Sequence, residues 1–322
     1  MKSTVIIPNY NGIEYLKSCI LSLQQQSYRD FKICVVDNGS KDGSCHWLKE
    51  NHPQILLIEL KENTGFSHAV NVGIKSADTE YVLLLNNDTQ VEEGFVKELE
   101  DAMEKYPGAF SVGARMLDMK QRQLLDGAGD LYCALGWAYA RGKGRRAEKY
   151  YTKADEIFSA CAGAAIYRKK IFEEIGYFDE NHFAYLEDCD LGYRAQIYGY
   201  RNYYEPKARV YHAGSASSGT RYNDFKVRLA ARNSIYLIYK NMPLLQIILN
   251  LPLLLAGFLI KYLFFVKKGF YKSYGEGIRE GFCLCVQKEG RRKKVRFRFI
   301  RIKNYLRLQF YLWKNTVERV RQ

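Results

Sequence analysis

Short, nearly continuous apolar runs alternate with amphipathic segments through the first 116 residues. The amphipathic segments carry apolar residues at helical spacing, as at Leu16, Ile20 and Leu23. Strands that are apolar on both faces and separated by helices are typical of a mostly parallel sheet covered by helices on both sides. The pattern therefore predicts an α/β fold with strands at residues 4–7, 32–36, 55–60, 81–85 and 110–116.

Each of the first four expected strands ends in a polar cluster. The clusters read PNYNG, DNGSKDGS, ENTGFS and NNDT. Asn, Asp, Gly and Ser form turns for local reasons, so one such cluster would predict only a turn. Parallel sheets bind ligands at the carboxyl ends of their strands, and four clusters on that edge therefore predict one shared ligand site.

The pattern becomes less regular from about residue 127 to residue 211, and a loop at residues 212–224 and a helix at about 225–240 follow. Residues 243–266 then form the most apolar segment of the chain. The segment is long enough to cross a bilayer, but Gln246, Asn250, Pro252 and Lys261 interrupt it. These interruptions favour a helix that lies at a membrane interface over one that spans, and a core or dimer helix is the third reading.

Charge separates the end of the chain from the rest. The 322 residues are 47% hydrophobic and include six prolines, which predicts a folded protein rather than a disordered one. The net charge is +14, and residues 261–322 account for it with eighteen Lys or Arg against four Asp or Glu. In RRKKVRFRFIRIK, at residues 291–303, cations alternate with apolar residues, which suits an anionic membrane surface.

Two other readings of the basic tail are a nucleic-acid-binding arm and a solvated run of charge. We favour the membrane, because the adjacent apolar segment would have no use in a nucleic-acid arm, and we expect no nucleic-acid partner. The eight cysteines form no CxxC pair, which predicts free thiols in a reducing compartment. An apolar strand follows Met1 at once, without a secretion signal, so we expect a cytoplasmic protein.

Asp88 ends the polar cluster that follows the strand at residues 81–85. Thr89 and Glu92 form a Thr-x-x-Glu pattern typical of a helix start, but this reading leaves Asp88 outside the helix. A carboxylate at the ligand edge of the sheet is well placed to bind Mg²⁺ or Mn²⁺, which take oxygen ligands and bridge diphosphates. We therefore expect a metal-binding role for Asp88.

Two carboxylate positions carry further candidate chemistry. Asp37 follows the strand at residues 32–36 and could accept a hydrogen bond from a base or a ribose, or form part of a turn and helix cap. In YLEDCDLGYR, neighbouring acids would raise the pKa of a partly buried carboxyl and suit it to accept a proton. The alternative is a helix N-terminus, which also favours acidic residues.

His212 precedes a loop rich in Gly and Ser. A single histidine is more often structural than functional. A loop of this composition beside an expected metal ligand favours a functional role, because such loops commonly close over a bound substrate.

The motifs, taken in order, resemble the inverting glycosyltransferase family 2, and within it the bacterial rhamnosyltransferase-like enzymes of cell-wall or capsular polysaccharide synthesis. The resemblance covers about residues 1–240 and rests on TVIIPNYNG, VVDNGSKDGS, NTGFSHAVNVGI, LLLNNDT, CAGAAIYRKKIFEEIGYFDE, YLEDCDLGYR and EPKARVYHAGSAS. It implies a GT-A fold, with a Rossmann-like nucleotide-sugar half at about 1–116 and an acceptor half at about 117–240. An apolar and basic helical appendage at 241–322 would then associate with the membrane.

The resemblance also implies roles for individual residues. Asp188 would be the catalytic base, and Asp88 and His212 would hold Mg²⁺ or Mn²⁺. Because this chain has Asn86 where the family often has a first acid, we expect weak metal binding until the donor is present. The substrates would be bound by Pro8, Asn9, Tyr10, Asp37, Asn63, Gly65, Asn71, Asn87, Glu187 and Arg232.

The implied activity is a single-displacement transfer from a nucleotide-sugar. The subgroup favours L-rhamnose from dTDP-rhamnose, and UDP-sugars stay open. A lipid-linked or polysaccharide acceptor at the inner leaflet would place the protein on the cytoplasmic face of the cell membrane, as a peripheral protein or with one spanning helix. A sugar-phosphate nucleotidyltransferase would usually carry a glycine-rich phosphate loop, which PNYNGIEY lacks, and a non-catalytic scaffold would have no need of Asp88, Asp188 and His212 together.

Overall fold

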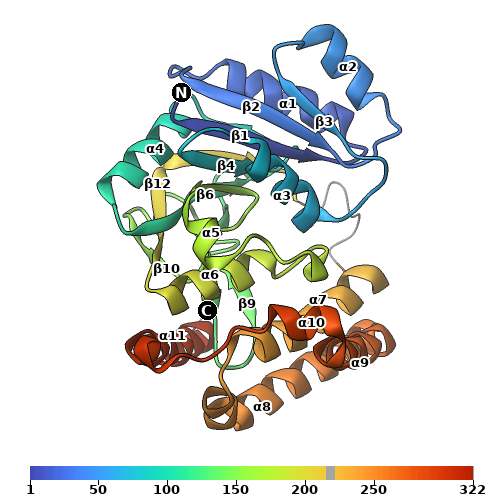
Figure 1. The fold of residues 1–322 in the computed structure, drawn as a ribbon, viewed down its shortest axis with the longest axis vertical. Helices are drawn as coiled ribbons and strands as arrows, with labels where there is room; N and C mark the ends of the chain where they lie inside the picture. The colour runs from blue at the N-terminus through green and yellow to red at the C-terminus, as the bar shows by residue number, and fades with distance from the viewer. Residues whose placement is uncertain (215–221, 322) are drawn as a thin grey trace.

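The centre of the fold is a ten-stranded sheet, seen in a computed structural model that describes residues 1–214 and 222–321 (Figure 1). Eight strands follow one another in the order β10-β12-β6-β11-β4-β1-β2-β3, while β5 pairs with β12 and β7 with β6. Two short strands, β8 and β9, form a separate hairpin. The strands are β1 (Ser3–Asn9), β2 (Phe31–Asp37), β3 (Leu56–Glu59), β4 (Tyr81–Leu85), β5 (Thr89–Val91), β6 (Ala109–Asp118), β7 (Leu125–Gly127), β8 (Asp130–Tyr132), β9 (Ala138–Ala140), β10 (Asp155–Ile157), β11 (Ala164–Arg168) and β12 (Arg201–His212).

The five strands expected from the apolar runs are all present, as β1, β2, β3, β4 and β6. The strands β1 to β4 pair in parallel, and β12 is parallel to β6. Only β11, among the long inner strands, runs antiparallel to its neighbours β4 and β6. The expectation of a mostly parallel α/β sheet is therefore confirmed.

Helices cover both faces of the sheet, because the apolar residues of each inner strand alternate between two cores. Val5 and Ile7 of β1 contact the core under α1 (Ile13–Gln24) and α4 (Phe95–Lys105). Ile6, between them, contacts the opposite core. That second core is closed by α3 (Phe66–Ser76), α5 (Ile171–Ile175) and α6 (Glu187–Tyr198), while α2 (Ser44–Asn51) packs beside β3.

Residues 89–92 do not start a helix, so that reading of the Thr-x-x-Glu pattern is wrong. Residues Thr89–Val91 form β5, which pairs with β12 through Val91 and Val210. The hydroxyl of Thr89 donates to the carbonyl oxygen of Asn86 at 2.6 Å, and α4 begins only at Phe95. A pairing with a strand more than 100 residues away overrides the local capping preference.

The C-terminal helices gather at the end of the molecule opposite β1, β2 and β3 (Figure 1). They are α7 (Asp224–Asn241), α8 (Leu244–Lys268), α9 (Tyr271–Val286), α10 (Lys288–Lys293) and α11 (Ile302–Arg321). Gly277 and Gly281 of α9 lie against α7, where an added Cβ would come within 2.2 Å and 2.7 Å of main-chain oxygens. Leu308 and Leu312 of α11 close a core with α6 and α7. The division at residue 240 stays a functional prediction, since both sides share this packing.

Helix α8 turns a face that contains two amide side chains towards the protein and most of its apolar residues outward. Gln246, Asn250, Leu254 and Gly257 are the buried positions, and they share one face of the helix. Gln246 accepts a hydrogen bond from Tyr193, and Asn250 exchanges hydrogen bonds with Gln309. Two of the residues that interrupt the apolar run are therefore packing contacts. Among the described residues, α8 is the helix long and apolar enough to cross a membrane.

Candidate active site

A large cavity of about 890 Å³ lies at the carboxyl ends of β1 and β4. We call it the large cavity. Strand ends form one side of it, and residues of the loop before α6, the β8–β9 hairpin and the start of α7 form the rest. Of the residues expected from the sequence to act on substrates or metal, those that line it are Pro8, Asn9, Tyr10, Asn63, Gly65, Asn87, Asp88, Glu187, Asp188 and His212.

Amide side chains connect the strand ends on one side of the large cavity. Asn9 donates to the carboxylate of Asp37 at 2.9 Å and accepts from Asn87 at 2.7 Å. Asp37 also accepts from the backbone amide of Ser40 at 2.8 Å and is buried behind the cavity wall. Asp37 therefore orients Asn9, which itself lines the large cavity.

Gly65 brings the strand-three loop against the loop that precedes α6. Its φ of 88° lies in the left-handed region, and a Cβ at this position would come within 2.6 Å of the Phe183 ring. The side chain of Asn63 accepts from the backbone amide of Gly65 at 3.0 Å and holds this turn. The backbone amide of Ser67 donates to the carbonyl oxygen of Phe183 at 3.2 Å, so the start of α3 and the loop before α6 are in direct contact here.

His212 lies between two carboxylates. Its Nε2 is 3.3 Å from Oδ1 of Asp88, and its Nδ1 is 2.8 Å from Oδ2 of Asp126. Burial opposes the charged ring, but the hydrogen bonds to Asp126 and Asp88 override it and raise the pKa of His212 to about 9. Lys143 forms an ion pair with the other oxygen of Asp126 at 2.5 Å. The group thus holds two carboxylates and two cations.

Asp188 stands in the first turn of α6, beside two further acids. Burial raises the pKa of Glu187 to about 8, and the charge of Asp188 adds to this effect. Burial, with the same neighbouring charge, also raises the pKa of Asp130 well above its ordinary value. Burial raises the pKa of Asp188 too, but backbone amides favour its charged form, and that of Cys189 donates to it at 2.7 Å. Asp188 is therefore the acid of this trio best suited to carry the negative charge.

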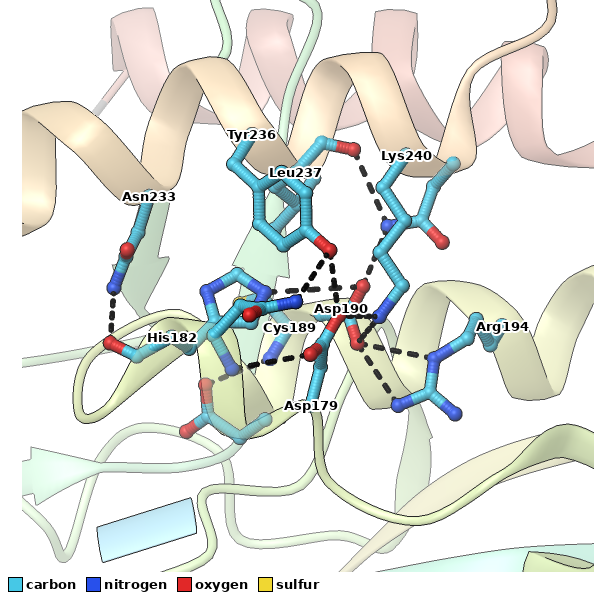
Figure 2. Close-up of polar contacts among 12 residues, drawn as sticks. Asp179, His182, Cys189, Asp190, Arg194, Asn233, Tyr236, Leu237 and Lys240 are labelled. Atoms are coloured by element: carbon cyan, nitrogen blue, oxygen red, sulfur yellow. Dashed lines mark hydrogen bonds and ion pairs between the residues drawn. The ribbon is translucent and has the colours of Figure 1, made fainter. Parts of the chain in front are cut away.

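The loop that leads into α6 is held in a strained conformation by α7. Phe183, Tyr185 and Leu186 have φ values of 61°, 70° and 68°, which side chains other than glycine rarely adopt. The side-chain amide of Asn233 donates to the carbonyl oxygens of His182, Ala184 and Tyr185, each within 2.9 Å. Figure 2 shows Asn233 above this loop. One side chain of α7 therefore fixes a wall of the large cavity.

Three residues expected from the sequence to bind substrate do not line the large cavity. Asp37 acts through Asn9, as described above. The amide of Asn71 is used by the backbone of Phe178 and by Glu180. Arg232 donates to the carbonyl oxygens of Asn181 and His182 and thus supports the same loop as Asn233. The expected Gly/Ser loop lies largely at residues 215–221, outside the described residues.

The structure also brings in residues that the sequence did not single out. Asp126, Asp130 and Lys143 come from the irregular stretch after β6, and Lys226 comes from the first turn of α7. Asp130, Lys143 and Lys226 line the large cavity. The sequence signal for the two acids is DGAGD, in which they stand four residues apart within a glycine-rich turn.

Two groups of side chains could hold a divalent cation. Asp88 and His212 offer a carboxylate oxygen and an imidazole nitrogen on the cavity wall, which suits Mn²⁺ or Mg²⁺. Asp130, Cys161 and Asp188 offer ligand atoms within 4.8 Å of one another. Burial raises the pKa of the Cys161 thiol well above its ordinary value, and a protonated thiol is a poor ligand for these hard cations. The pair Asp88 and His212 therefore fits such an ion better.

The arrangement agrees with a match to a known protein family. Residues 4–176 match the model for glycosyl transferase family 2. This chain belongs to glycosyl transferase family 2. Membership makes it a glycosyltransferase that acts on nucleotide-sugars and confirms the expectation drawn from the motifs.

Relatives with known names agree with family 2 membership. The chain is 27% identical over 236 residues to an N-acetylglucosaminyl-diphospho-decaprenol L-rhamnosyltransferase of Mycobacterium tuberculosis, covering 67% of this chain and 77% of that protein. It is 36% identical over 115 residues to the glycosyltransferase GlyA of Streptococcus pneumoniae, covering 35% of this chain and 16% of that one.

The solved structures show that the fold is GT-A. The mannosyltransferase PcManGT of Pyrobaculum calidifontis, in complex with GDP-Man and Mn²⁺, superimposes with a TM-score of 0.54 at 16% identity, covering 97% of this chain and 84% of that one. GalNAc-T7 with UDP, GalNAc and Mn²⁺ has a TM-score of 0.61 at 14% identity, and the match covers 74% of this chain and 48% of that longer chain.

Proposed function

We propose that this chain is an inverting glycosyltransferase that moves a sugar from a nucleotide-sugar to a lipid-linked or polysaccharide acceptor. The observation that carries the proposal is that Asp188, a candidate base, and the pair Asp88 and His212, a candidate metal site, line the same large cavity. Its volume of about 890 Å³ lies within the range that is typical of small-molecule binding sites.

Asp188 would act as the general base. The acceptor hydroxyl attacks the anomeric carbon, a new C–O bond forms, and the bond from that carbon to the diphosphate oxygen breaks. The hydroxyl proton passes to the carboxylate of Asp188, which must be charged beforehand. Glu187 and Asp130, whose pKa values are raised, leave the negative charge with Asp188. A single displacement from the face opposite the leaving group inverts the anomeric configuration.

The large cavity also holds groups suited to the leaving diphosphate. Asp88 and His212 would hold Mg²⁺ or Mn²⁺, which when bound neutralises charge on the departing diphosphate. Lys143 and Lys226 line the same cavity and would add positive charge to it. Arg232 would contribute indirectly, through the loop carbonyls that it supports.

The donor and acceptor are proposed from the relatives. The M. tuberculosis relative is named as an L-rhamnosyltransferase that acts on an N-acetylglucosaminyl-diphospho-decaprenol. We therefore propose L-rhamnose from dTDP-rhamnose as the donor sugar and a polyprenyl-diphosphate-linked glycan as the acceptor. A UDP-sugar is the alternative donor, because the S. aureus TarS fragment, with a TM-score of 0.54 and 18% identity, was solved with UDP-GlcNAc.

A membrane-associated location on the cytoplasmic face is part of the same proposal. The outward face of α8 exposes Leu245, Leu255 and Leu259, each more than half accessible to solvent. Exposed apolar surface of this extent is unusual for a soluble monomer and typical of a membrane or protein contact. The basic segment at residues 291–303 lies at the same end of the molecule as α8 (Figure 1).

Release of nucleoside diphosphate tests the reaction. The purified chain would be incubated with Mn²⁺, an acceptor and either dTDP-rhamnose or a UDP-sugar, and the anomeric configuration of the product would be read by NMR. We expect metal-dependent release with inversion. An Asp188→Asn variant should bind the donor with wild-type affinity and lose turnover by roughly a hundredfold or more, since general bases contribute about 10²–10⁴ in rate.

Asp78→Asn is the matched control, because Asp78 is an exposed acid paired with Lys32 far from the large cavity. It should turn over like the wild type. If Asp188→Asn turned over at the wild-type rate, Asp188 would not be the base. A product with retained anomeric configuration would rule out the single displacement.

A further inference from the structure

A second cavity, of about 310 Å³, lies between the loop after α5, the C-terminal half of α6 and the segment that joins α10 to α11. We call it the basic cavity. It shares no lining residue with the large cavity. Helix α6 connects the two, because Asp188 stands in its first turn while Arg194 and Tyr198 line the basic cavity, about 15 Å along the helix from Asp188 to Tyr198.

The floor of the basic cavity is electrically balanced. Arg194 and Lys240 both donate to the buried carboxylate of Asp190, at 2.8 Å each. Lys240 also donates to Asp179 at 2.7 Å, and Figure 2 shows all four charged groups together. Arg194 gives its remaining donors to carbonyl oxygens at the end of α5. The positive charges of Arg194 and Lys240 therefore balance the negative charges of Asp179 and Asp190, and both carboxylates of this network already have cationic partners.

The remaining wall of the basic cavity is strongly positive. It includes five cations from the end of α10 and the segment that follows, namely Lys293, Lys294, Arg296, Arg298 and Arg301. Within the described residues, no ion pair joins any of these five to an acidic side chain. Their convergence on one cavity without counter-charge favours a bound anion.

The segment is held in place, unlike a solvated run of charge. The backbone amide of Val295 donates to the carbonyl oxygen of Lys240 at 2.8 Å. The guanidinium of Arg301 lies 3.5 Å from the ring centre of Tyr198, and the ammonium of Lys294 lies 4.2 Å from that of Tyr239. These contacts hold the backbone of the segment and the side chains of Lys294 and Arg301 at the cavity.

Apolar residues of the same segment indicate which anion binds. Phe299 and Ile300 are 78% and 88% exposed, and Phe297 is 47% exposed. They alternate with the cations along the chain, and a soluble phosphate compound would make no use of them. A lipid would use both sets, with its phosphate in the basic cavity and its chains beside the aromatic and aliphatic side chains.

We propose that the basic cavity binds the phosphate headgroup of an anionic membrane phospholipid at the surface where α8 docks. This inference rests on the proposed membrane association and adds a defined, saturable site to it. Since the site lies on α6 and beside the network that joins α6 to α7, an occupied cavity anchors to the membrane the helix that carries Asp188.

The test compares two double variants of the full chain that remove equal charge. Arg296→Gln with Arg298→Gln changes the cavity wall, and Arg291→Gln with Arg292→Gln changes exposed residues of α10 that do not line it. On vesicles of phosphatidylglycerol in phosphatidylcholine both should weaken binding, because each cation near an anionic surface contributes roughly fivefold. The discriminating probe is therefore dihexanoyl phosphatidic acid, a lipid soluble as a monomer, measured by calorimetry.

We expect one short-chain lipid to bind per chain in the wild type and in the Arg291/Arg292 variant, and the Arg296/Arg298 variant to lose at least roughly tenfold in affinity. Equal losses in the two variants would overturn the proposal in favour of general surface charge. If inorganic phosphate or diphosphate competed for the site as well as the lipid does, the ligand would be a free anion and the lipid proposal would be wrong. If duplex DNA bound more tightly than the lipid and this binding were lost in the Arg296/Arg298 variant, the ligand of the basic cavity would be nucleic acid and the proposal would be wrong.

Donor hydrolysis separates this inference from the proposed function. Both double variants should release nucleoside diphosphate from a soluble nucleotide-sugar at the wild-type rate, since neither touches the large cavity. A wild-type chain without transfer activity would refute the proposed function while leaving lipid binding to be judged by calorimetry alone.

Discussion

The buried carboxylate of Asp190 offers a quantitative test of how α6 and α7 are held together. Its Oδ2 accepts hydrogen bonds from Arg194 and Lys240, and its Oδ1 accepts one from Asn241 at 2.8 Å (Figure 2). Burial alone would raise the pKa of Asp190, but the charges of Arg194 and Lys240 hold it well below its ordinary value. Asp190→Asn removes the charge while keeping the size of the side chain.

The expected loss follows from the charges left behind. With Asp190 neutral, Arg194 and Lys240 would share the single charge of Asp179 inside the protein. Removing one partner of a buried ion pair leaves an uncompensated buried charge and costs about 3–5 kcal/mol. Unfolding entropy of about 2.1 cal/mol/K per residue gives roughly 0.7 kcal/mol/K for a chain of this length, so Tm should fall by about 4–7 °C.

The loss should depend on pH in a defined direction. A carboxylate with a depressed folded pKa contributes stability that is fully present above its unfolded pKa of about 3.9 and is lost as the pH falls through the folded value. The difference between wild type and Asp190→Asn should therefore stay constant from about pH 5 to pH 8 and shrink below about pH 4.

Calorimetry and denaturant unfolding measure this loss. Asp101→Asn is the control, since Asp101 is an exposed acid paired with Lys97, and it should change little. Adding Lys240→Met to Asp190→Asn removes the cation that Asp190→Asn leaves without its partner. The double variant should therefore lose less unfolding free energy than the sum of the two single variants. A loss below about 1 kcal/mol in Asp190→Asn, or simple additivity in the double variant, would refute the idea of a closed buried network.

Two further predictions concern the metal and the C-terminal packing. Because His212 has a pKa of about 9 and a metal ion must displace its proton, Mn²⁺ affinity of the donor-free chain should be weak at neutral pH, rise towards about pH 9, and increase at any pH when nucleoside diphosphate is added. Tight, pH-independent binding in calorimetry would contradict this. Gly277→Ala should cost about 1–3 kcal/mol, because the new Cβ meets the carbonyl oxygen of Arg228, whereas Gly275→Ala, which meets open space, should not destabilise the protein in thermal unfolding.

The sequence predicted the parts of the fold that local pattern determines. The strand at residues 81–85 is completely buried, so its run of apolar residues is visible without the rest of the chain. The strand β5 at Thr89–Val91 could not be predicted in this way, because it forms only through its pairing with β12. The apolar character of α8 was equally plain, but Gln246 and Asn250 could be recognised as one packing face only once Gln309 was placed beside them.

The residues of the candidate site likewise divide into those that local sequence pattern predicts and those that it does not. Asp88 follows the fully buried β4 and Asp188 lies in the first turn of α6; both were expected from their motifs, and both line the large cavity. Asp126 and Asp130 stand at strands of three residues, which have no periodicity to detect. Lys226 lies in the first turn of α7, and none of its neighbours in the sequence marks it as part of a cavity.

Asp126 offers a physical reason why this chain can have Asn86 where the family often has an acid. A metal ion at Asp88 and His212 would meet only one carboxylate directly. The other ring nitrogen of His212 lies 2.8 Å from Asp126, and a carboxylate in that position orients a metal-binding histidine and makes it a stronger ligand. Under this proposal the second negative charge would come from the irregular stretch after β6 and would act through the imidazole ring. Before a metal binds, the same two acids stabilise the protonated ring, so the charge that would strengthen the metal site also keeps a proton in its place.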